Sequence, residues 1–255
     1  MSDDDGSTGG GARIEAVELS RRFGPHRALD GVSLCIEPGE TFGLLGANGA
    51  GKTTFIRLVT GYLIPSAGRV SVDSFSPVTQ PDEVHALLGY VPETTQLYPE
   101  LRVESFLRFA GGVRGLAGPD LDRAVERALG RFGLEGMARR LVGNLSKGYQ
   151  QRVSLAQAFL HEPRLVIVDE PTSGLDPLQQ AEVRGVLAAL RGRRTVLLCT
   201  HDLAEARELT SRVAVLRRGR LVRLGPTAEV LGGDDPYALF RDDDPSAESE
   251  AGAAP

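Results

Sequence analysis

The sequence predicts an α/β fold in which a core of buried parallel strands carries an antiparallel β subdomain and an inserted helical subdomain. Three observations predict this fold. In the second half of the chain, continuous apolar runs alternate with segments of helical periodicity, as in parallel sheets covered by helices. Near the N-terminus, apolar and polar residues alternate as they do in half-buried antiparallel strands. Between these regions, from about residue 103 to residue 160, only helical periods occur.

The individual elements follow in chain order. Alternation predicts antiparallel strands at residues 14–19, 32–36 and 69–73, and the apolar run 41–45 predicts a short buried strand that leads into a helix at 52–59. Helical periods follow at 103–110 and 121–129, the second with a start signal at Pro119 and Asp120 and a stop at Gly133. Apolar runs at 165–168 and 195–199 then predict buried parallel strands, which alternate with helices at 178–190 and 203–209.

This order predicts one domain with two tails. Residues 1–12 are polar and glycine-rich, and residues 237–255 are acidic, so both ends are expected to be disordered. The domain then spans residues 13–236, with the helical insertion at about 94–163.

A glycine-rich loop joins the strand at 41–45 to the helix at 52–59. Residues 46–53 match the phosphate-binding P-loop pattern G-x-x-x-x-G-K-[ST], and the lysine of this match is one of only two in the chain. Glycines can take positive φ, so successive amides can turn inward around an anion while the helix N-terminus favours negative charge. Lys52 would reach the β- and γ-phosphates, and Thr53 would ligate Mg²⁺. The alternative is a plain glycine-rich turn. The predicted ATP contacts of this loop are Asn48, Gly49, Ala50, Gly51, Lys52, Thr53 and Thr54.

Two carboxylates follow the buried strand at 165–168. Residues at the carboxyl end of such a strand face the ligand crevice of an α/β sheet. Asp169 is expected to hold Mg²⁺ together with Thr53, and Glu170 to polarise a water aimed at the γ-phosphate. Apolar strands often end in solvated acids, so this signal depends on the P-loop upstream.

A third motif, at residues 145–152, precedes a helix with an apolar face. Ser146 is a natural N-cap, and Gly148 permits close backbone approach, which makes a helix N-terminus suited to an anion. The alternative is an ordinary capped helix.

Charge and hydropathy limit the partners and the location. The net charge is −5 and arginines are spread along the chain, so a nucleic-acid partner is not expected. No apolar run reaches the roughly 18 residues of a membrane span, and no secretory signal is visible. The expected location is therefore cytoplasmic.

The order and spacing of these motifs resemble the ATP-binding subunit of ABC transporters over residues 14–231. Residues 145–151 are similar to the family's LSGGQ signature, 173–176 to its D-loop, 200–202 to its switch-histidine segment and 90–93 to its Q-loop region. Phe23 is similar to the aromatic residue that stacks on adenine. The resemblance implies a P-loop NTPase core of the RecA-like type, with the antiparallel β subdomain and the inserted α-helical subdomain described above.

The resemblance also implies a function. The chain would be an ATPase, with ATP and Mg²⁺ as cofactors, that sits on the inner face of the cell membrane and energises separate integral-membrane permease subunits. A second copy, or a homologous subunit, would face it head to tail, and ATP-driven closure and opening would act on the permease through the helical insertion. Glu170 and His201 would be catalytic, whereas Ser146, Gly148 and Asp176 would contact the ATP of the second subunit. Taken alone, His201 could be a buried or solvated histidine, and Asp176 a simple N-cap before a proline.

Two departures from the family pattern affect the interpretation. Glu93 stands where the family has glutamine; it is expected to ligate the metal, while a water-positioning role is in doubt. Lys147 and Tyr149 replace a glycine and a glutamine of the signature. Such variants resemble the exporter-type (ABC-2) subunits more than sugar importers. The alternative functions are a soluble ABC ATPase without a permease, as in iron–sulfur cluster assembly, and a nucleotide-gated binding module.

Overall fold

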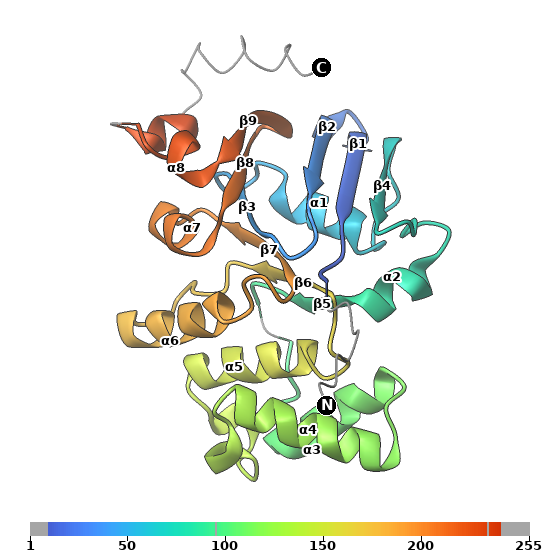
Figure 1. Cartoon of the computed structure of the whole chain (residues 1–255), viewed down its shortest axis with the longest axis vertical. Helices are drawn as coiled ribbons and strands as arrows, with labels where there is room; N and C mark the ends of the chain where they lie inside the picture. The colour runs from blue at the N-terminus through green and yellow to red at the C-terminus, as the bar shows by residue number, and fades with distance from the viewer. Residues whose placement is uncertain (1–9, 95, 234, 241–255) are drawn as a thin grey trace, which may run out of the picture.

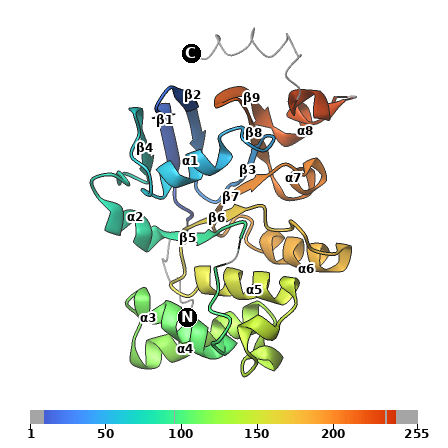
Figure 2. The same cartoon turned by 180° about the vertical axis from the view of Figure 1, so that it is seen from behind.

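The residues that the structure describes fold into two β-sheets, with a separate group of helices at one end of the molecule (Figure 1). The structure, a computed structural model, describes residues 10–94, 96–233 and 235–240. The helices α3 (Val103–Val113), α4 (Gly118–Arg131) and α5 (Lys147–Ala158) lie at one end. The three-stranded sheet lies at the other end beside part of the six-stranded sheet, which extends from there towards these helices. The view from behind gives the same order (Figure 2). The predicted α/β class with inserted helices is confirmed.

The six-stranded sheet forms the centre of the molecule and has the order β5-β6-β7-β3-β8-β9. Its strands are β3 (Thr41–Leu45), β5 (Leu88–Val91), β6 (Leu165–Asp169), β7 (Thr195–Thr200), β8 (Arg212–Arg217) and β9 (Arg220–Pro226). The first five strands in that order pair in parallel, and β9 returns antiparallel to β8. Every residue of β3, β6 and β7 is buried, which explains their unbroken apolar runs. The carboxyl ends of these three strands meet at one edge of the sheet.

Three strands of this sheet lie outside the predicted ones. β5 has four residues, including a glycine, and is too short to show a period. β8 and β9 form a hairpin with arginines at its turn, so polar residues interrupt the apolar pattern that would identify them. Arg217, Arg218 and Arg220 lie at this hairpin turn.

The three-stranded sheet is antiparallel throughout, with the order β2-β1-β4. Its strands are β1 (Ile14–Phe23), β2 (His26–Ile36) and β4 (Ala67–Val72), so the three predicted strands are confirmed. β1 and β2 extend beyond the predicted segments into a tight hairpin in which Phe23 pairs with His26 across Gly24, whose φ is +57°. This extension carries Phe23 away from the rest of the sheet towards the P-loop.

The remaining helices flank the six-stranded sheet. They are α1 (Lys52–Val59), α2 (Pro81–Leu87), α6 (Pro177–Ala188), α7 (Leu203–Leu209) and α8 (Thr227–Val230). α1 and α7 have the predicted bounds, whereas α2 and α8 lie outside the prediction. The predicted stop after α4 is confirmed because Gly133 takes a φ of +62° and the Leu134 amide donates back to the Leu129 carbonyl at 2.8 Å.

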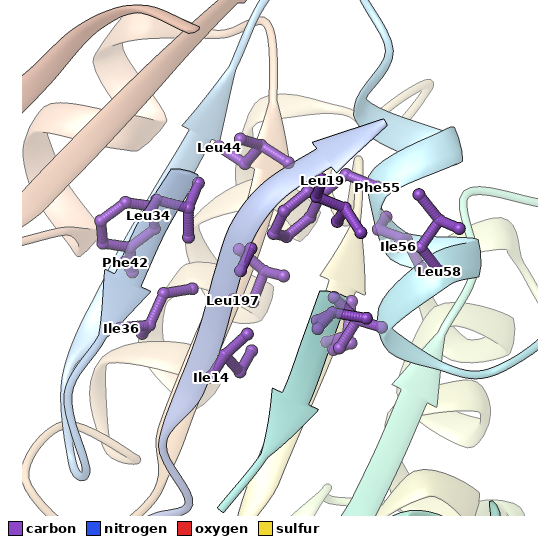
Figure 3. Packing of buried hydrophobic residues seen from close by; sticks show 14 of the residues in the cluster. Ile14, Leu19, Leu34, Ile36, Phe42, Leu44, Phe55, Ile56, Leu58 and Leu197 are labelled. Atoms are coloured by element: carbon purple, nitrogen blue, oxygen red, sulfur yellow. The ribbon is translucent and has the colours of Figure 1, made fainter. Parts of the chain in front are cut away.

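Both faces of the central sheet are covered, and successive residues of each strand enter different cores. Ile167 and Leu197 pack with the three-stranded sheet and α1, whereas their neighbours Val166 and Leu198 pack with the inserted helices. Figure 3 shows Leu197 on the side that faces β1 and α1. The central sheet therefore separates a β-rich core from a helical core.

The ends of the domain differ slightly from the prediction. Ala12 is fully buried and its amide donates to the Arg164 carbonyl at 3.3 Å, while the Arg164 guanidinium donates to the Gly10 and Gly11 carbonyls. Residues 10–12 of the predicted N-terminal tail are thus packed against the sheet, and residues 1–9 lie outside the described residues. At the other end Pro236–Phe240 forms a 3₁₀ turn, and residues 241–255 lie outside the described part. Among the described helices, none combines the length and the apolar composition needed to cross a membrane.

Candidate functional site

A cavity of about 440 Å³ opens at the carboxyl edge of the central sheet. Four segments line it: the β1–β2 hairpin, the P-loop with the start of α1, the residues after β5 and the end of β6. The lining residues are Phe23, His26, Ala28, Ala47, Asn48, Gly49, Gly51, Lys52, Thr53, Thr54, Glu93, Asp169 and Glu170. The structure therefore brings together the loop, carboxylate and aromatic residues that the sequence analysis selects from distant parts of the chain.

The P-loop needs glycine at two positions for different reasons. Gly51 immediately precedes α1 with a φ of +110°, and a Cβ there would lie 2.7 Å from the Ala28 carbonyl oxygen. Gly46 has an ordinary φ, but a Cβ would lie 2.6 Å from the Leu216 carbonyl oxygen. The loop is therefore packed tightly on its outer side, and the first amides of α1, which have no partner within the helix, lie beside the cavity.

Lys52 and Glu170 form a buried ion pair at the floor of the cavity. Their side chains are 6% and 9% exposed, and the distance between Lys52 Nζ and Glu170 Oε1 is 3.4 Å. Lys52 Nζ also donates to the Gly46 carbonyl, and Glu170 Oε2 lies 2.9 Å from Nδ1 of His201, whose side chain is half exposed. The backbone of Glu170 has a φ of +46°, a left-handed conformation that is strained for a residue with a Cβ. Strain of this kind persists where the surroundings hold a side chain in one place.

Asp169 sits beside this pair and carries an unbalanced negative charge. It is 3% exposed, and burial raises its pKa to about 6, with Glu170 and Glu93 adding to the rise and Lys52 opposing it. Three carboxylates therefore share one ammonium. The described residues contain no preformed metal cage. Nevertheless, the donor set of Thr53, Asp169 and Glu93 consists of oxygens only and has excess negative charge, which fits Mg²⁺ that also keeps water or phosphate ligands.

The far end of the cavity is formed by the β1–β2 hairpin. Phe23 is 44% exposed, and the guanidinium carbon of Arg21 lies 4.7 Å from its ring centroid. Arg21 is held in turn by the Ile64 carbonyl, which accepts from Nη1 at 2.7 Å. His26 and Ala28 also line the cavity and are absent from the sequence analysis, although their closeness to Phe23 in a predicted hairpin would have been the signal to find them.

Five predicted site residues do not line the cavity. Ala50 is buried behind the P-loop, and His201 reaches the site only through Glu170. Ser146 caps α5 by accepting from the Tyr149 amide at 3.4 Å, and Asp176 caps α6 by accepting from the Gln179 amide at 2.9 Å. Gly148 packs on α6, where a Cβ would lie 2.8 Å from the Gln179 side chain. The capping roles given as alternatives are thus observed, and contact with a second subunit's ATP stays a prediction.

The second lysine of the chain lies at the start of α5. Lys147 is exposed, and its Nζ lies 3.8 Å from the position that a Cβ of Gly174 would take in the D-loop segment. Lys52 and Lys147 therefore occupy different motifs, one within the cavity and one outside it.

Comparisons with known proteins agree with this geometry. The family model described as ABC transporter matches residues 29–173. The chain is 37% identical over 219 residues to the probable multidrug ABC transporter ATP-binding protein YbhF of Escherichia coli (strain K12), covering 86% of this chain but only 38% of YbhF. It is 36% identical over 218 residues to the ABC transporter ATP-binding protein NatA of Bacillus subtilis (strain 168), covering 83% of this chain and 89% of NatA.

Solved structures give the same result. The structure of cbiO1 from Clostridium perfringens, described as part of the ABC transporter complex cbiONQ, is similar with a TM-score of 0.79 at 29% identity, covering 88% of this chain and 91% of cbiO1. The fold, the cavity and these similarities lead to one conclusion: the chain belongs to the ABC transporter family, as one of its ATP-binding proteins.

Proposed function

We propose that this chain binds MgATP in the cavity and hydrolyses it to drive a separate membrane permease, as the ATPase subunit of an exporter. The observation that carries the proposal is the meeting of the P-loop, Asp169, Glu170 and Phe23 around one cavity. The names of YbhF and NatA support a transport role. Export is favoured by the LSKGY-type signature at residues 145–149 and by the word multidrug in the name of YbhF.

The residues of the cavity have separate tasks in this proposal. Phe23 stacks on adenine, while the P-loop amides and Lys52 hold the β- and γ-phosphates. Thr53, Asp169 and Glu93 hold Mg²⁺, which screens the charge of the phosphate oxygens when bound. Lys52 must then leave Glu170 for the triphosphate.

Hydrolysis depends on Glu170 and His201. Once Lys52 has turned to the phosphates, the Glu170 carboxylate is free to accept a proton from water in line with the γ-phosphate. His201 lies 2.9 Å from the other carboxylate oxygen and orients it, and its own side chain is half exposed. Glu170 and His201 are thus paired in the structure.

A second subunit completes the site in this proposal. Ser146 and Lys147 at the N-terminus of α5 are exposed and do not line the chain's own cavity, so they are available to an ATP held by another copy or a homologous subunit. Asp176, which is exposed at the start of α6, belongs to the same proposed surface, and Gly148, which is buried against α6, supports it at the start of α5. Closure around ATP and release after hydrolysis would alternate as the γ-phosphate contacts form and disappear.

The inserted helices offer a docking surface for the permease. Tyr98, Phe109 and Val113 are 47%, 50% and 71% exposed, and the rings of Tyr98 and Phe109 are in edge contact at 5.5 Å. Exposed apolar clusters of this kind mark interaction sites. Docking here would place the chain peripherally on the inner face of the membrane.

Two measurements test the proposal. Lys52→Ala should abolish retention of ATP by the purified chain, whereas Lys147→Ala, the matched lysine control outside the cavity, should leave retention by the isolated chain unchanged. Equal retention by both variants would refute the nucleotide site. Affinity purification from detergent-solubilised membranes should recover a polytopic partner that alters steady-state ATP hydrolysis. Recovery of none, with turnover independent of membranes, would favour a soluble ABC ATPase.

A further inference from the structure

Glu205 is a fully buried carboxylate that the site described above does not use. It lies in the first turn of α7, is 0% exposed and does not line the cavity. Burial is costly for a carboxylate, and it raises the pKa of Glu205 even though the Thr172 hydroxyl donates to it and opposes the rise. Oε2 has no hydrogen-bond partner among the described residues. A leucine would fill this position without these costs, so the carboxylate needs an explanation.

Glu205 and its hydrogen-bond partner Thr172 lie on the two segments that follow the proposed catalytic residues. The Thr172 hydroxyl donates to Oε1 at 3.0 Å, and Thr172 is itself 5% exposed. Thr172 lies two residues after Glu170 on the segment that leads to the D-loop, whereas Glu205 lies on α7, the helix that follows His201. Glu205 therefore bridges the segment that carries the proposed base and the segment that carries its histidine partner.

The strained backbone around Glu170 has to be held in place by contacts with its neighbours. The strained φ of Glu170 is held by its amide, which donates to the Cys199 carbonyl at 2.8 Å on the β7 side. On the other side of Thr172, its carbonyl accepts from Gln180 of α6 at 3.4 Å. The hydrogen bond between Thr172 and Glu205 lies between these two backbone contacts. It ties the loop after Glu170 to the helix after His201.

We propose that Glu205 is a positioning residue, whose carboxylate fastens Thr172 so that the Glu170–His201 pair keeps its alignment towards the reacting water. It acts through these residues and touches no nucleotide. The proposal rests on the proposed ATPase function. It predicts that loss of the bridge slows turnover while the P-loop, Lys52 and Phe23 continue to bind ATP.

The test removes each side of the bridge separately and together. Glu205→Leu and Thr172→Val should each lower kcat on the order of tenfold to a hundredfold, with the Kd for fluorescent ATP analogues within about twofold of wild type. The conservative Glu205→Gln and Thr172→Ser keep an acceptor and a donor and should retain most of the turnover. The double variant Thr172→Val/Glu205→Leu should fall no further than the slower single variant, since both remove one interaction. Glu208→Leu is the matched control, because Glu208 lies on the same helix with its side chain 57% exposed.

The outcomes separate this inference from the function on which it rests. A wild-type chain without ATP turnover refutes the proposed function. A wild type that hydrolyses ATP, with Thr172→Val at wild-type kcat or with fully additive losses in the double variant, refutes the bridge alone. Loss of ATP affinity in step with kcat would also refute it, because that pattern indicates a general structural role. Should Glu205→Leu fail to fold, the near-isosteric Thr172→Val compared with Thr172→Ser decides the question, with the melting temperature measured for each.

Discussion

Replacing Glu170 by glutamine is expected to change ATP affinity and turnover in opposite directions. The Lys52–Glu170 pair, at 3.4 Å and with both groups less than a tenth exposed, has a Coulomb attraction of about 5 kcal/mol at an effective dielectric constant of about 20. Desolvation offsets most of this attraction, and about 1–2 kcal/mol is a reasonable net value. Glutamine keeps the shape but removes the charge that competes with the triphosphate for Lys52. ATP should therefore bind about tenfold more tightly to Glu170→Gln.

Turnover should fall in the same variant because an amide cannot accept the proton of the attacking water. General-base catalysis contributes about 10²–10⁴-fold, so phosphate release should slow by that factor. Fluorescent-nucleotide titration measures the affinity, a coupled phosphate assay measures the turnover, and light scattering detects accumulation of an ATP-bound dimer.

Glu40→Gln provides the control for removal of a buried paired carboxylate. The Glu40 side chain is 10% exposed and lies 3.1 Å from Arg212, at the opposite end of β3 from the P-loop. Glu40→Gln should leave both the ATP affinity and the rate of turnover unchanged. Unchanged turnover in Glu170→Gln would mean that Glu170 is not the base, and weaker ATP binding would refute the competition for Lys52.

Three further predictions concern other parts of the chain. Phe23→Ala should weaken ATP binding about tenfold or more by removing base stacking, while Phe23→Tyr retains it; equal fluorescent-nucleotide affinities would contradict stacking. Glu93→Gln should raise the Mg²⁺ concentration needed for half-maximal turnover, and an identical Mg²⁺ titration would reject Glu93 as a ligand. Burial, with the Arg114 charge, lowers the pKa of His161 to about 4, so its contribution to stability is complete above the unfolded pKa of about 6.5 and is lost as pH falls towards 4. Between pH 7 and pH 5, urea unfolding should show wild type losing about 1 kcal/mol more than His161→Gln, after allowance for partial exposure, and equal losses would refute this assignment.

The binding elements of the site are predictable because each is a local pattern. The P-loop is a contiguous run whose residue types have one geometric purpose, and Asp169 and Glu170 end a strand that is buried on both faces. Their meeting in one cavity follows from the parallel arrangement of β3, β7 and β6. The pairing of charged groups within the cavity is different, because it depends on register. Asp169 stands opposite Cys199, which places Glu170 beside the segment of His201, and no sequence pattern encodes that alignment.

The strands that the sequence does not predict lack a regular pattern of apolar residues. The short β5 and the arginine-rich β8–β9 hairpin are strands because they pair with buried neighbours, which only the assembled sheet reveals. Likewise, the role of Glu205 depends on its contact with Thr172, which lies 33 residues earlier in the chain. A glutamate in a helix does not by itself indicate such a contact. The assignments of Ser146, Gly148 and Asp176 remain predictions because they concern a second chain.

The chain's use of arginine almost everywhere else leaves Lys52 and Lys147 as its only side-chain primary amines. Reductive methylation with ¹³C-formaldehyde would therefore place a single side-chain NMR label at the exposed start of α5, because Lys52 is buried in its ion pair. In the proposed assembly this methyl group lies near a nucleotide held by the other subunit. Its resonance would then follow closure without any cysteine or tag being introduced.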